Sequence, residues 1–308
     1  FIALPVFSAD ISPIAKQTAD YAVQTYQKSM VASLAKLIKY NTLAIDGISA
    51  NDNPAHIAFK AELKKQAEDL GFDYQDDGYV VVIGLGENKE RFGIITHGDV
   101  QPANPKKWKQ SPFSLDTTSE PGKLIGRGTE DDKGPISTAM YAMKAIKDKA
   151  VPLKKRIELY VYMAEESDWA PLVEFIKTNT LPQVNITIDA EYPVVIAEKG
   201  YGTISMTFPK TTDNLAKQAL ENKLHLSAFT GGFFGSQIPE DAQAIIENAT
   251  QSLFAQLKIK AQQHPKIKYD YQWKNKQLTI TALGKSAHSS KPEDGVNAIT
   301  HLADLLAV

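Results

Sequence analysis

The chain has 308 residues, which is long enough for two domains, because single hydrophobic cores stop growing at roughly 250 to 300 residues. Its 34 basic and 36 acidic residues leave a net charge of only -2, so the composition favours neither a nucleic-acid partner nor an acidic membrane surface. The absence of cysteine excludes disulfides, thiolate metal sites and cysteine nucleophiles. A metal site would therefore use histidine and carboxylate ligands, and a small substrate fits the charge balance best.

Both ends of the chain carry patterns that look incomplete. The N-terminus opens without Met on the apolar stretch FIALPVFSADI, which is either the remainder of a secretory signal peptide or the lead-in to the first helix. The first alternative implies a periplasmic or secreted protein, and the second a cytoplasmic one. The last residues, AITHLADLLAV, still follow a helical pattern without a stop signal, so we expect truncation at both ends. No run approaches the ~18 apolar residues of a membrane span.

Helical spacing of apolar residues predicts two opening helices, after which strands and helices alternate. The predicted helices cover residues 14–39, 54–70, 135–147 and 170–179, and the predicted strands cover residues 79–86, 91–100, 156–166 and 183–193. Asn53 and Pro54 mark the start of the second helix, and Gly71 follows its end. This alternation favours an α/β fold whose central sheet is mostly parallel.

The pattern changes after about Lys199. Residues 201–208 and 276–284 alternate between apolar and polar side chains, which predicts strands with one solvated face. A long helix is predicted between them, over residues 240–258. The sequence therefore predicts an α/β domain over residues 1–199 and a second, α+β domain over residues 200–308.

Metal-capable side chains stand where three of the predicted strands end. The strand GIITH ends at His97, with Asp99 two residues on. Glu165 and Glu166 end the next strand, and Asp189 ends the third. Because ligands bind outside the carboxyl ends of strands in open α/β sheets, we expect these groups to converge on one crevice. So many carboxylates would repel one another in an empty site, and divalent cations remove that repulsion.

The stretch GRGTEDDKGP, residues 126–135, adds three consecutive acidic residues just before a predicted helix. Histidine with Asp and Glu, in the absence of cysteine, is the ligand set of catalytic zinc and less often of manganese or cobalt. Asp131 is the best candidate to bridge two ions because it lies on a tight loop. The helix dipole by itself explains part of the charge at Glu130 and Asp132.

Adjacent carboxylates at Glu165 and Glu166 allow two roles. One side chain can bind metal while its neighbour takes a proton from water and passes it to the leaving amine. Asp99 would orient His97 and fix its tautomer. Three further histidines are expected at the surface, namely His56, His225 and His264.

Together and in this order, these motifs resemble the M20 family of co-catalytic zinc metallopeptidases, from about residue 15 to the end of the chain. HGDVQP is similar to the family's His-x-Asp segment, GRGTEDDKGP to its Asp loop, AEESDW to its Glu-Glu pair and IDAEYP to its later metal-binding Asp. DDKGP and DAEYPV look most like PepV-like bacterial dipeptidases. The resemblance implies a zinc-exopeptidase-like catalytic domain over residues 1–199 and a lid or dimerisation domain over residues 200–308.

The resemblance also implies a role for each motif residue. His97 and Asp189 would hold one zinc ion, Glu166 would hold the other, and Asp131 would bridge them, with two zinc ions per complete chain. Glu165 would be the general acid/base. A cis peptide bond would follow Asp131.

The second domain contains GKSAHSSKPEDGVNA, which is similar to the family's lid motif. In that role His288 would hydrogen-bond the oxyanion of the tetrahedral intermediate or the substrate carboxylate. GGFFGSQIPEDA resembles the lid's substrate loop, but Ser236 stands where the family has Asn, which affects substrate anchoring. The family's second zinc takes a His from a C-terminal segment, and His301 is a poor substitute for it. A homodimer through this domain is also implied.

The resulting hypothesis is a hydrolase that cleaves the peptide bond of dipeptides or short peptides with a water activated by two zinc ions. Two alternatives stay open. One is an N-acyl amino acid deacylase of the same family, and the other is a binding protein of the same fold without catalytic competence. The expected partner is a small peptide, with neither nucleic acid nor membrane.

Overall fold

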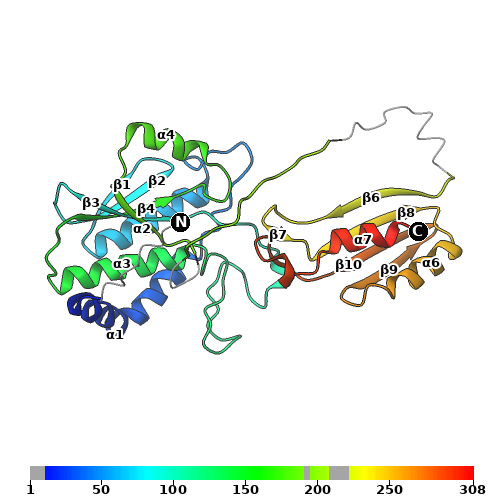
Figure 1. Cartoon of the computed structure of the whole chain (residues 1–308), viewed down its shortest axis with the longest axis horizontal. Coiled ribbons are helices and arrows are strands. Elements are labelled where there is room, and N and C mark those ends of the chain that lie inside the picture. Colours follow the sequence, from blue (N-terminus) through cyan, green and yellow to red (C-terminus); the bar gives the residue numbers. More distant parts are fainter. Residues whose placement is uncertain (1–10, 191–194, 208–221) are drawn as a thin grey trace, which may run out of the picture. The chain divides into compact units, whose positions relative to one another are not determined.

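The structure is a computed structural model that describes residues 11–190, 195–207 and 222–308 (Figure 1). The chain divides into two compact units, residues 1–196 and 197–308, and each has its own hydrophobic core. The boundary lies near the predicted one at residue 199, and the catalytic and lid roles of the two units stay predictions. Among the described residues, no helix has both the length and the apolar character needed to cross a membrane.

Unit 1 alternates helices with the strands of one five-stranded sheet. In chain order its elements are α1 (Pro13–Leu37), α2 (Pro54–Asp69), β1 (Asp73–Asp76), β2 (Val80–Leu85), β3 (Arg91–His97), η1 (Pro105–Lys107), α3 (Lys133–Asp148), β4 (Arg156–Tyr162), α4 (Ala170–Thr178) and β5 (Val184–Thr187). The predicted start of α2 is confirmed, because the Asn53 side chain accepts a hydrogen bond from the backbone N–H of Ala55 and Pro54 occupies the first turn. Gly71, just after α2, has a φ of +74°, which favours glycine.

The strand order in this sheet is β1-β2-β4-β3-β5. β3 runs parallel to β4 and to β5, whereas β2 runs antiparallel to β1 and to β4. The prediction of an α/β fold is confirmed, but the mostly parallel arrangement holds only for β4, β3 and β5. Residues 77–79 join β1 to β2, and so short a connection permits only an antiparallel hairpin, since parallel strands need a crossover of a dozen or more residues.

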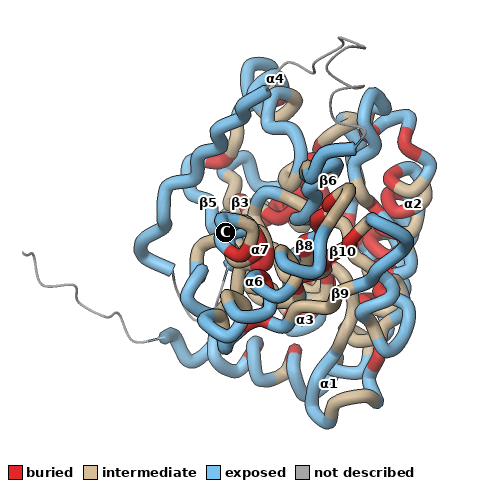
Figure 2. Tube along the Cα trace, turned by 90° about the vertical axis from the view of Figure 1, so that its right-hand side faces the viewer, coloured by how far each residue is buried: buried red, intermediate tan, exposed pale blue. Residues whose placement is uncertain are grey.

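Helices cover both faces of the sheet, with α1 and α3 on one side of the strands and α4 on the other (Figure 1). On the first face, Phe59 of α2 and Met140 of α3 pack in one buried cluster with Leu159 of β4. On the opposite face, Phe175 of α4 packs with Val82 of β2. β5 lies at the edge of the sheet and is exposed along its length (Figure 2).

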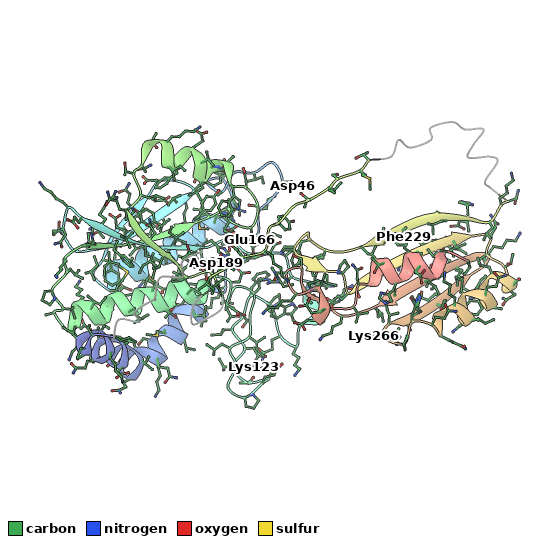
Figure 3. The ribbon with its side chains drawn as sticks, viewed as in Figure 1. Asp46, Lys123, Glu166, Asp189, Phe229 and Lys266 are labelled. Carbon is green, nitrogen blue, oxygen red and sulfur yellow. The ribbon has the colours of Figure 1, made fainter. Side chains whose placement is uncertain are left out.

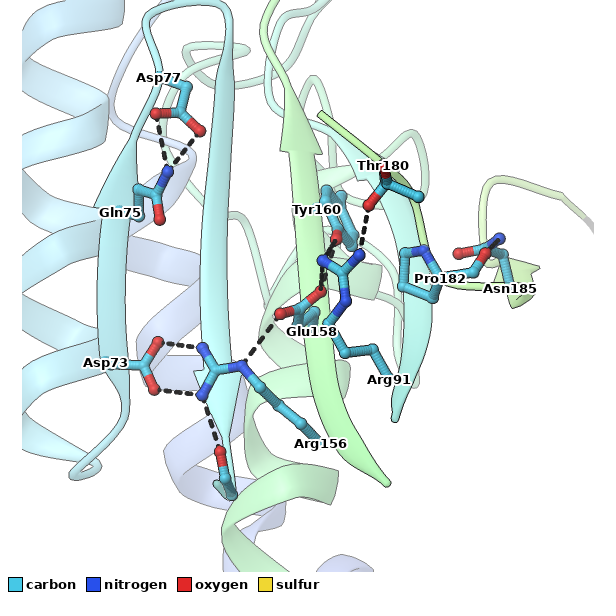
Figure 4. A network of polar contacts seen from close by, with 11 residues as sticks. Asp73, Gln75, Asp77, Arg91, Arg156, Glu158, Tyr160, Thr180, Pro182 and Asn185 are labelled. Atoms are coloured by element: carbon cyan, nitrogen blue, oxygen red, sulfur yellow. Dashed lines mark hydrogen bonds and ion pairs between the residues drawn. The ribbon is translucent and has the colours of Figure 1, made fainter. Parts of the chain in front are cut away.

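A polar network ties the strands together at the end where β3 and β4 begin (Figure 4). Arg156 donates two hydrogen bonds to the Asp73 carboxylate, at 2.8 and 2.5 Å, and a third to Glu158 at 3.0 Å. Glu158 also accepts from Arg91 at 3.1 Å and from the Tyr160 hydroxyl at 2.5 Å. The buried Glu158 carboxylate is thus paired with Arg156, Arg91 and Tyr160, as a buried charge requires.

Unit 2 is an α+β unit with a four-stranded antiparallel sheet in the order β6-β8-β10-β9 and a two-stranded ribbon of β11 and β7. Its elements are β6 (His225–Gly231), β7 (Gln237–Ile238), β8 (Asp241–Glu247), α6 (Gln251–Ala261), β9 (Lys268–Lys274), β10 (Gln277–Leu283), β11 (Ala287–His288), η2 (Pro292–Asp294) and α7 (Ala298–Leu306). Leu257 of α6 and Leu302 of α7 are fully buried in one cluster with Ile280 of β10. The predicted strand over residues 276–284 is confirmed.

One prediction for this unit is wrong in part and another is wrong. Of the helix predicted over residues 240–258, the part from residue 251 onward is confirmed by α6, but residues 241–247 form strand β8, because Ala242, Ala244 and Ile246 alternate inward and pair with β10. Residues 201–207, predicted as a strand, form no regular element, and Phe208 lies outside the described residues. Alternation alone does not make a strand, which also needs a neighbouring chain to complete its hydrogen bonds.

Candidate metal centre

The carboxyl ends of β4, β3 and β5 lie side by side at one edge of the unit 1 sheet. The parallel register places His97, at the end of β3, opposite Tyr162, at the end of β4. On the other side, Ile188 donates a backbone hydrogen bond to Ile95 at 3.1 Å, which places Asp189 at the same edge. The residues that follow these strands therefore meet in one place, and Figure 3 labels two of them, Glu166 and Asp189.

His97 stands at the centre of this group, with 1% of its side chain exposed. Its Nε2 atom lies 2.8 Å from an Asp131 carboxylate oxygen and 3.6 Å from one of Asp189, yet it makes no hydrogen bond. Burial by itself favours the neutral imidazole, but the contacts with Asp131, Asp189 and Asp99 outweigh it and raise the pKa of His97 well above its usual value. The Nε2 atom therefore faces a concentration of negative charge.

Asp99 connects the segment that follows β3 to the segment that follows β4 by hydrogen bonds. Its fully buried carboxylate accepts hydrogen bonds from the backbone N–H groups of Glu165 and Glu166, both at 3.0 Å. The backbone oxygen of Asp99 also lies 3.1 Å from His97 Nδ1, and the carboxylate is 3.4 Å from that same nitrogen. Asp99 thus contacts His97, as predicted, and it also holds the turn that carries the two glutamates, which the sequence did not indicate.

The loop before α3 brings Asp131 to the site from another part of the chain. The peptide bond between Asp131 and Asp132 is cis, which confirms the expectation. Burial opposes ionisation of Asp131, but the contact with His97 outweighs it and keeps the pKa of this carboxyl below its usual value. Asp131 therefore remains anionic beside the imidazole.

Glu165 and Glu166 are partly buried beside this cluster. Burial, together with the nearby Asp189, Asp99 and Asp131 carboxylates, raises the pKa of Glu165 to about 7. Burial and the Asp131 charge likewise raise the pKa of Glu166 to about 8, although Gln101 donates a hydrogen bond to its carboxylate at 2.7 Å. Both carboxyls are thus able to exchange protons near neutral pH.

Three further residues belong to the site, and the sequence did not single them out. Asp132 was partly explained by the helix dipole, but its side chain makes no capping hydrogen bond to α3. It is fully buried, accepts a hydrogen bond from Thr96 and leaves its other oxygen, Oδ1, without a partner. Gln101 holds Glu166, and the charge of Arg127 acts on Asp131 and Glu166. All three stand inside the motifs HGDVQP and GRGTEDDKGP, and that position is the signal that could have drawn attention to them.

The described residues fit a metal ion. Donor atoms lie within 4.8 Å of one another in two overlapping groups, one of His97, Asp131 and Glu166 and one of His97, Asp132 and Asp189. His97 Nε2 and Asp132 Oδ1 are buried without a hydrogen-bond partner, whereas buried polar atoms are nearly always paired. A divalent cation would satisfy both atoms, and a nitrogen and oxygen donor set suits zinc.

The geometry does not reproduce the expected ligand sets in full. Glu166 shares a group with His97 and Asp131, whereas Asp189 shares one with His97 and Asp132. The bridging role of Asp131 between two ions therefore stays a prediction.

His288 lies in unit 2, on the β7–β11 ribbon. It pairs with Gln237 across the ribbon, and Ser289 donates a backbone hydrogen bond to the carbonyl of Ser236 at 2.8 Å. Ser290 donates its backbone N–H to His288 Nδ1 at 3.2 Å, and its hydroxyl lies 2.7 Å from the same nitrogen, so the ring proton is assigned to Nε2. The structure therefore brings the two residues of the predicted lid motifs, His288 and Ser236, together on one ribbon.

Comparison with known proteins decides the family. A profile described as "Peptidase family M20/M25/M40" matches residues 93–302, which include every predicted ligand and His288. The chain belongs to this M20 peptidase family. An M20 relative from Staphylococcus aureus (strain bovine RF122 / ET3-1), named "Putative dipeptidase SAB1611c", is 31% identical over 292 residues, which cover 92% of this chain and 60% of that protein.

A second M20 relative, "Putative dipeptidase YtjP" of Bacillus subtilis (strain 168), is 30% identical over 246 residues, covering 79% of this chain and 51% of that protein. The chain thus spans about half to three fifths of the length of these curated relatives. The crystal structure of human carnosine dipeptidase 1 is 12% identical, covers 96% of this chain and 77% of that chain, and gives a TM-score of 0.50. That likeness concerns the fold alone.

Proposed function

We propose that this chain supplies the metal-binding and proton-transfer groups of an M20 hydrolase that cleaves the peptide bond of dipeptides or short peptides. Membership of the peptidase family supports the reaction class. The dipeptidase names of the two bacterial relatives support short peptides as substrates.

One observation carries the metal part of the proposal. His97 Nε2 is buried 2.8 Å from the Asp131 carboxylate, without a hydrogen bond, and a second carboxylate from Asp189 lies 3.6 Å away. An imidazole nitrogen surrounded by carboxylate oxygens is the donor arrangement that a divalent cation needs, and a bound cation would take the place of the proton that these carboxylates otherwise hold on the ring. We assign His97, Asp131, Glu166 and Asp189 as the ligands, and two zinc ions per chain as the full complement.

Bound zinc ions would polarise the scissile carbonyl and make water more acidic. Glu165 belongs to neither donor group but adjoins Glu166, so its carboxylate is free to take up and return a proton beside the ions. Burial raises the pKa of this carboxyl, which favours its protonated form after the first transfer. Glu165 would take a proton from the attacking water and give it to the departing amine nitrogen. Asp99 would hold Glu165 in place for this transfer through the backbone N–H of that residue.

His288 would act on the oxyanion that forms at the scissile carbonyl. Its ring is exposed on unit 2, and its Nε2–H is a donor in the neutral tautomer. For this role His288 would have to reach the substrate bound at the metal centre. In the same proposal, unit 2 forms a homodimer interface, for which β6 and β9, the outer strands of its sheet within the described part of the chain, offer pairing positions.

The test is hydrolysis by the zinc-loaded protein of a panel of free dipeptides beside the matching N-acetyl and N-succinyl amino acids, each with a chelated control. We expect chelator-sensitive cleavage of the free dipeptides. Cleavage confined to the acylated substrates would assign the protein to the deacylases instead. Metal binding without cleavage of either set would favour the non-catalytic binding protein.

A further inference from the structure

Thr42 lies in the segment between α1 and α2 and contacts the loop that carries two site residues. It is fully buried, and its hydroxyl donates a hydrogen bond to the carbonyl of Gly98 at 2.6 Å. Its own carbonyl accepts the backbone N–H of Val100 at 3.2 Å. Gly98 and Val100 are the neighbours of Asp99, and Gly98 directly follows His97. Thr42 therefore forms hydrogen bonds to this loop on both sides of Asp99.

His56, on α2, contacts the carbonyl of Thr42. The prediction that His56 lies at the surface is wrong, because 2% of the residue is exposed, and its Nε2 lies 2.9 Å from the carbonyl of Thr42. Burial lowers the pKa of His56, so the ring is neutral near neutral pH. Because a carbonyl can only accept, His56 Nε2 carries the proton and its N–H donates a hydrogen bond to the carbonyl of Thr42. α2 is thereby joined to the same segment.

Lys133 joins this segment to the acidic loop. It is the first residue of α3, directly after Asp132, and it is fully buried. Its Nζ atom donates to the carbonyl of Tyr40 at 2.6 Å, and that carbonyl also accepts the backbone N–H of Thr42 at 3.0 Å. Residues 40–42 are therefore bonded to both loops that bring donor groups to the candidate metal centre.

We propose that Thr42 is a positioning residue, which fixes the His97–Asp99 segment relative to the Asp131–Asp132 loop and so sets the spacing of the metal donors. The inference rests on the proposed function, since the spacing matters only if these donors hold an ion. Thr42 itself belongs to neither donor group. Metal sites tolerate only a few tenths of an ångström in donor positions, and loss of a supporting contact typically costs 10–100-fold in metal affinity or activity. A residue with a merely structural role would affect stability alone.

The experiment compares Thr42→Val, which keeps the side-chain shape without the hydroxyl, with Thr42→Ser, which restores the hydroxyl. Ser137→Ala is the matched control, because Ser137 is equally buried and donates to a backbone carbonyl, that of Met30, at 2.8 Å. Two quantities are measured for each variant and for the wild-type chain: the dissociation constants of Zn²⁺ and Co²⁺, and the amide hydrogen exchange of peptides that cover residues 94–102 and 160–168.

We expect Thr42→Val to weaken metal binding by about 10-fold or more and to speed exchange in both peptides, with Thr42→Ser close to wild type. Ser137→Ala should lower thermal stability without either change. Equal metal affinity and equal loop exchange in Thr42→Val and Ser137→Ala would overturn the inference. If the wild-type chain binds no metal, the proposed function fails. In that case, faster exchange in Thr42→Val but not in Ser137→Ala would still support the inference that Thr42 positions the loop. Unchanged exchange in Thr42→Val would refute that inference.

Discussion

At the scale of single residues, the site depends on carboxylates whose surroundings differ sharply. The Asp99 carboxylate, which follows β3, accepts hydrogen bonds from two backbone N–H groups of the turn after β4. Glu165 lies on that turn, and burial together with the neighbouring carboxylates raises its pKa to about 7. Identical chemical groups thus acquire different tasks: one holds the turn and the other can carry a proton. The assignment of these tasks comes from burial and hydrogen bonding and not from residue type.

Glu165→Gln should lower kcat for a dipeptide by about 10²- to 10⁴-fold, which is the usual contribution of general acid–base catalysis. Zinc affinity should stay close to that of the wild type, because Glu165 belongs to neither group of donor atoms. Steady-state kinetics with a parallel metal titration measure both quantities. Glu174→Gln, the same change on the exposed Glu174 of α4, is the control and should leave kcat unchanged. Normal turnover in Glu165→Gln would remove Glu165 from the mechanism.

Asp116, in the long loop before α3, has a carboxyl group whose contribution to folding stability depends on pH. Hydrogen bonds from the side chain of Ser119 and from the backbone N–H groups of Thr118 and Ser119 hold the pKa of Asp116 well below its usual value. A carboxyl with a lowered folded pKa stabilises the fold above its unfolded pKa of about 3.9, and this stabilisation is lost as the pH falls through the folded value.

We therefore expect Asp116→Asn to be less stable than the wild type at pH 7 and the difference to shrink progressively below pH ~4. Urea unfolding at a series of pH values measures it. Asp20→Asn serves as the control, because Asp20 pairs with Lys16 on the exposed face of α1 and its loss should matter little at any pH. A difference between Asp116→Asn and the wild type that does not change with pH would contradict this assignment.

At the scale of elements, α3 begins where the acidic loop, residues 128–132, ends, and the first turn of α3 is in close contact with the backbone of that loop. Lys133 donates its backbone N–H to the carbonyl of Gly128 at 2.9 Å, which closes the loop, and Gly128 has a φ of +85° that favours glycine. Gly134, in the first turn of α3, faces the carbonyl of Thr129 so closely that a Cβ atom would overlap that oxygen. The position of Asp131 is therefore coupled to the first turn of the helix.

Gly134→Ala should destabilise the protein and weaken metal binding, although alanine at an ordinary helix position would stabilise it by about 1 kcal/mol relative to glycine. The overlap with the backbone of Thr129 has no flexible side chain to relieve it, so the steric effect outweighs helix propensity. Thermal unfolding and zinc titration test the prediction. Gly200→Ala is a control, because a Cβ atom at Gly200 meets nothing within 4 Å. A higher melting temperature in Gly134→Ala would contradict the prediction and show that the backbone at Thr129 can move to accommodate the Cβ atom.

At the scale of the whole molecule, the two units have separate cores. The buried cluster of unit 1 contains residues such as Leu159 and Met140, and that of unit 2 contains Leu257 and Leu302, with no residue in common. All donors of the candidate metal centre belong to unit 1, whereas His288 belongs to unit 2. The proposed metal binding and the proposed stabilisation of the oxyanion therefore belong to units with separate hydrophobic cores.

Leu302→Ala should cost about 2–5 kcal/mol in unit 2, the usual range for a fully buried leucine, and should leave zinc binding by unit 1 unchanged. Hydrogen exchange resolved by unit, together with metal titration, separates the two effects. The reciprocal variant Leu159→Ala, in the core of unit 1, should reduce zinc affinity and leave exchange in unit 2 as it was. Loss of zinc binding in Leu302→Ala would show that the units are coupled.

The sequence by itself determined the features that depend on local pattern. Strand and helix alternation in unit 1 followed from apolar periodicity, the start of α2 from Asn53 and Pro54, and the convergence of His97, Glu166 and Asp189 from their places after strands. These succeed because capping, periodicity and strand direction are properties of neighbouring residues.

Only the tertiary structure decided the rest. Ala242, Ala244 and Ile246 belong equally well to a strand and to part of a helix until β10 supplies a ladder of hydrogen bonds on one side. The burial of His56 and the inward direction of Asp132 were likewise invisible, because each depends on which distant segment packs against the residue. A sequence shows which groups can carry out a reaction, whereas the partners of each group, which set its charge and position, are fixed only when the chain has folded.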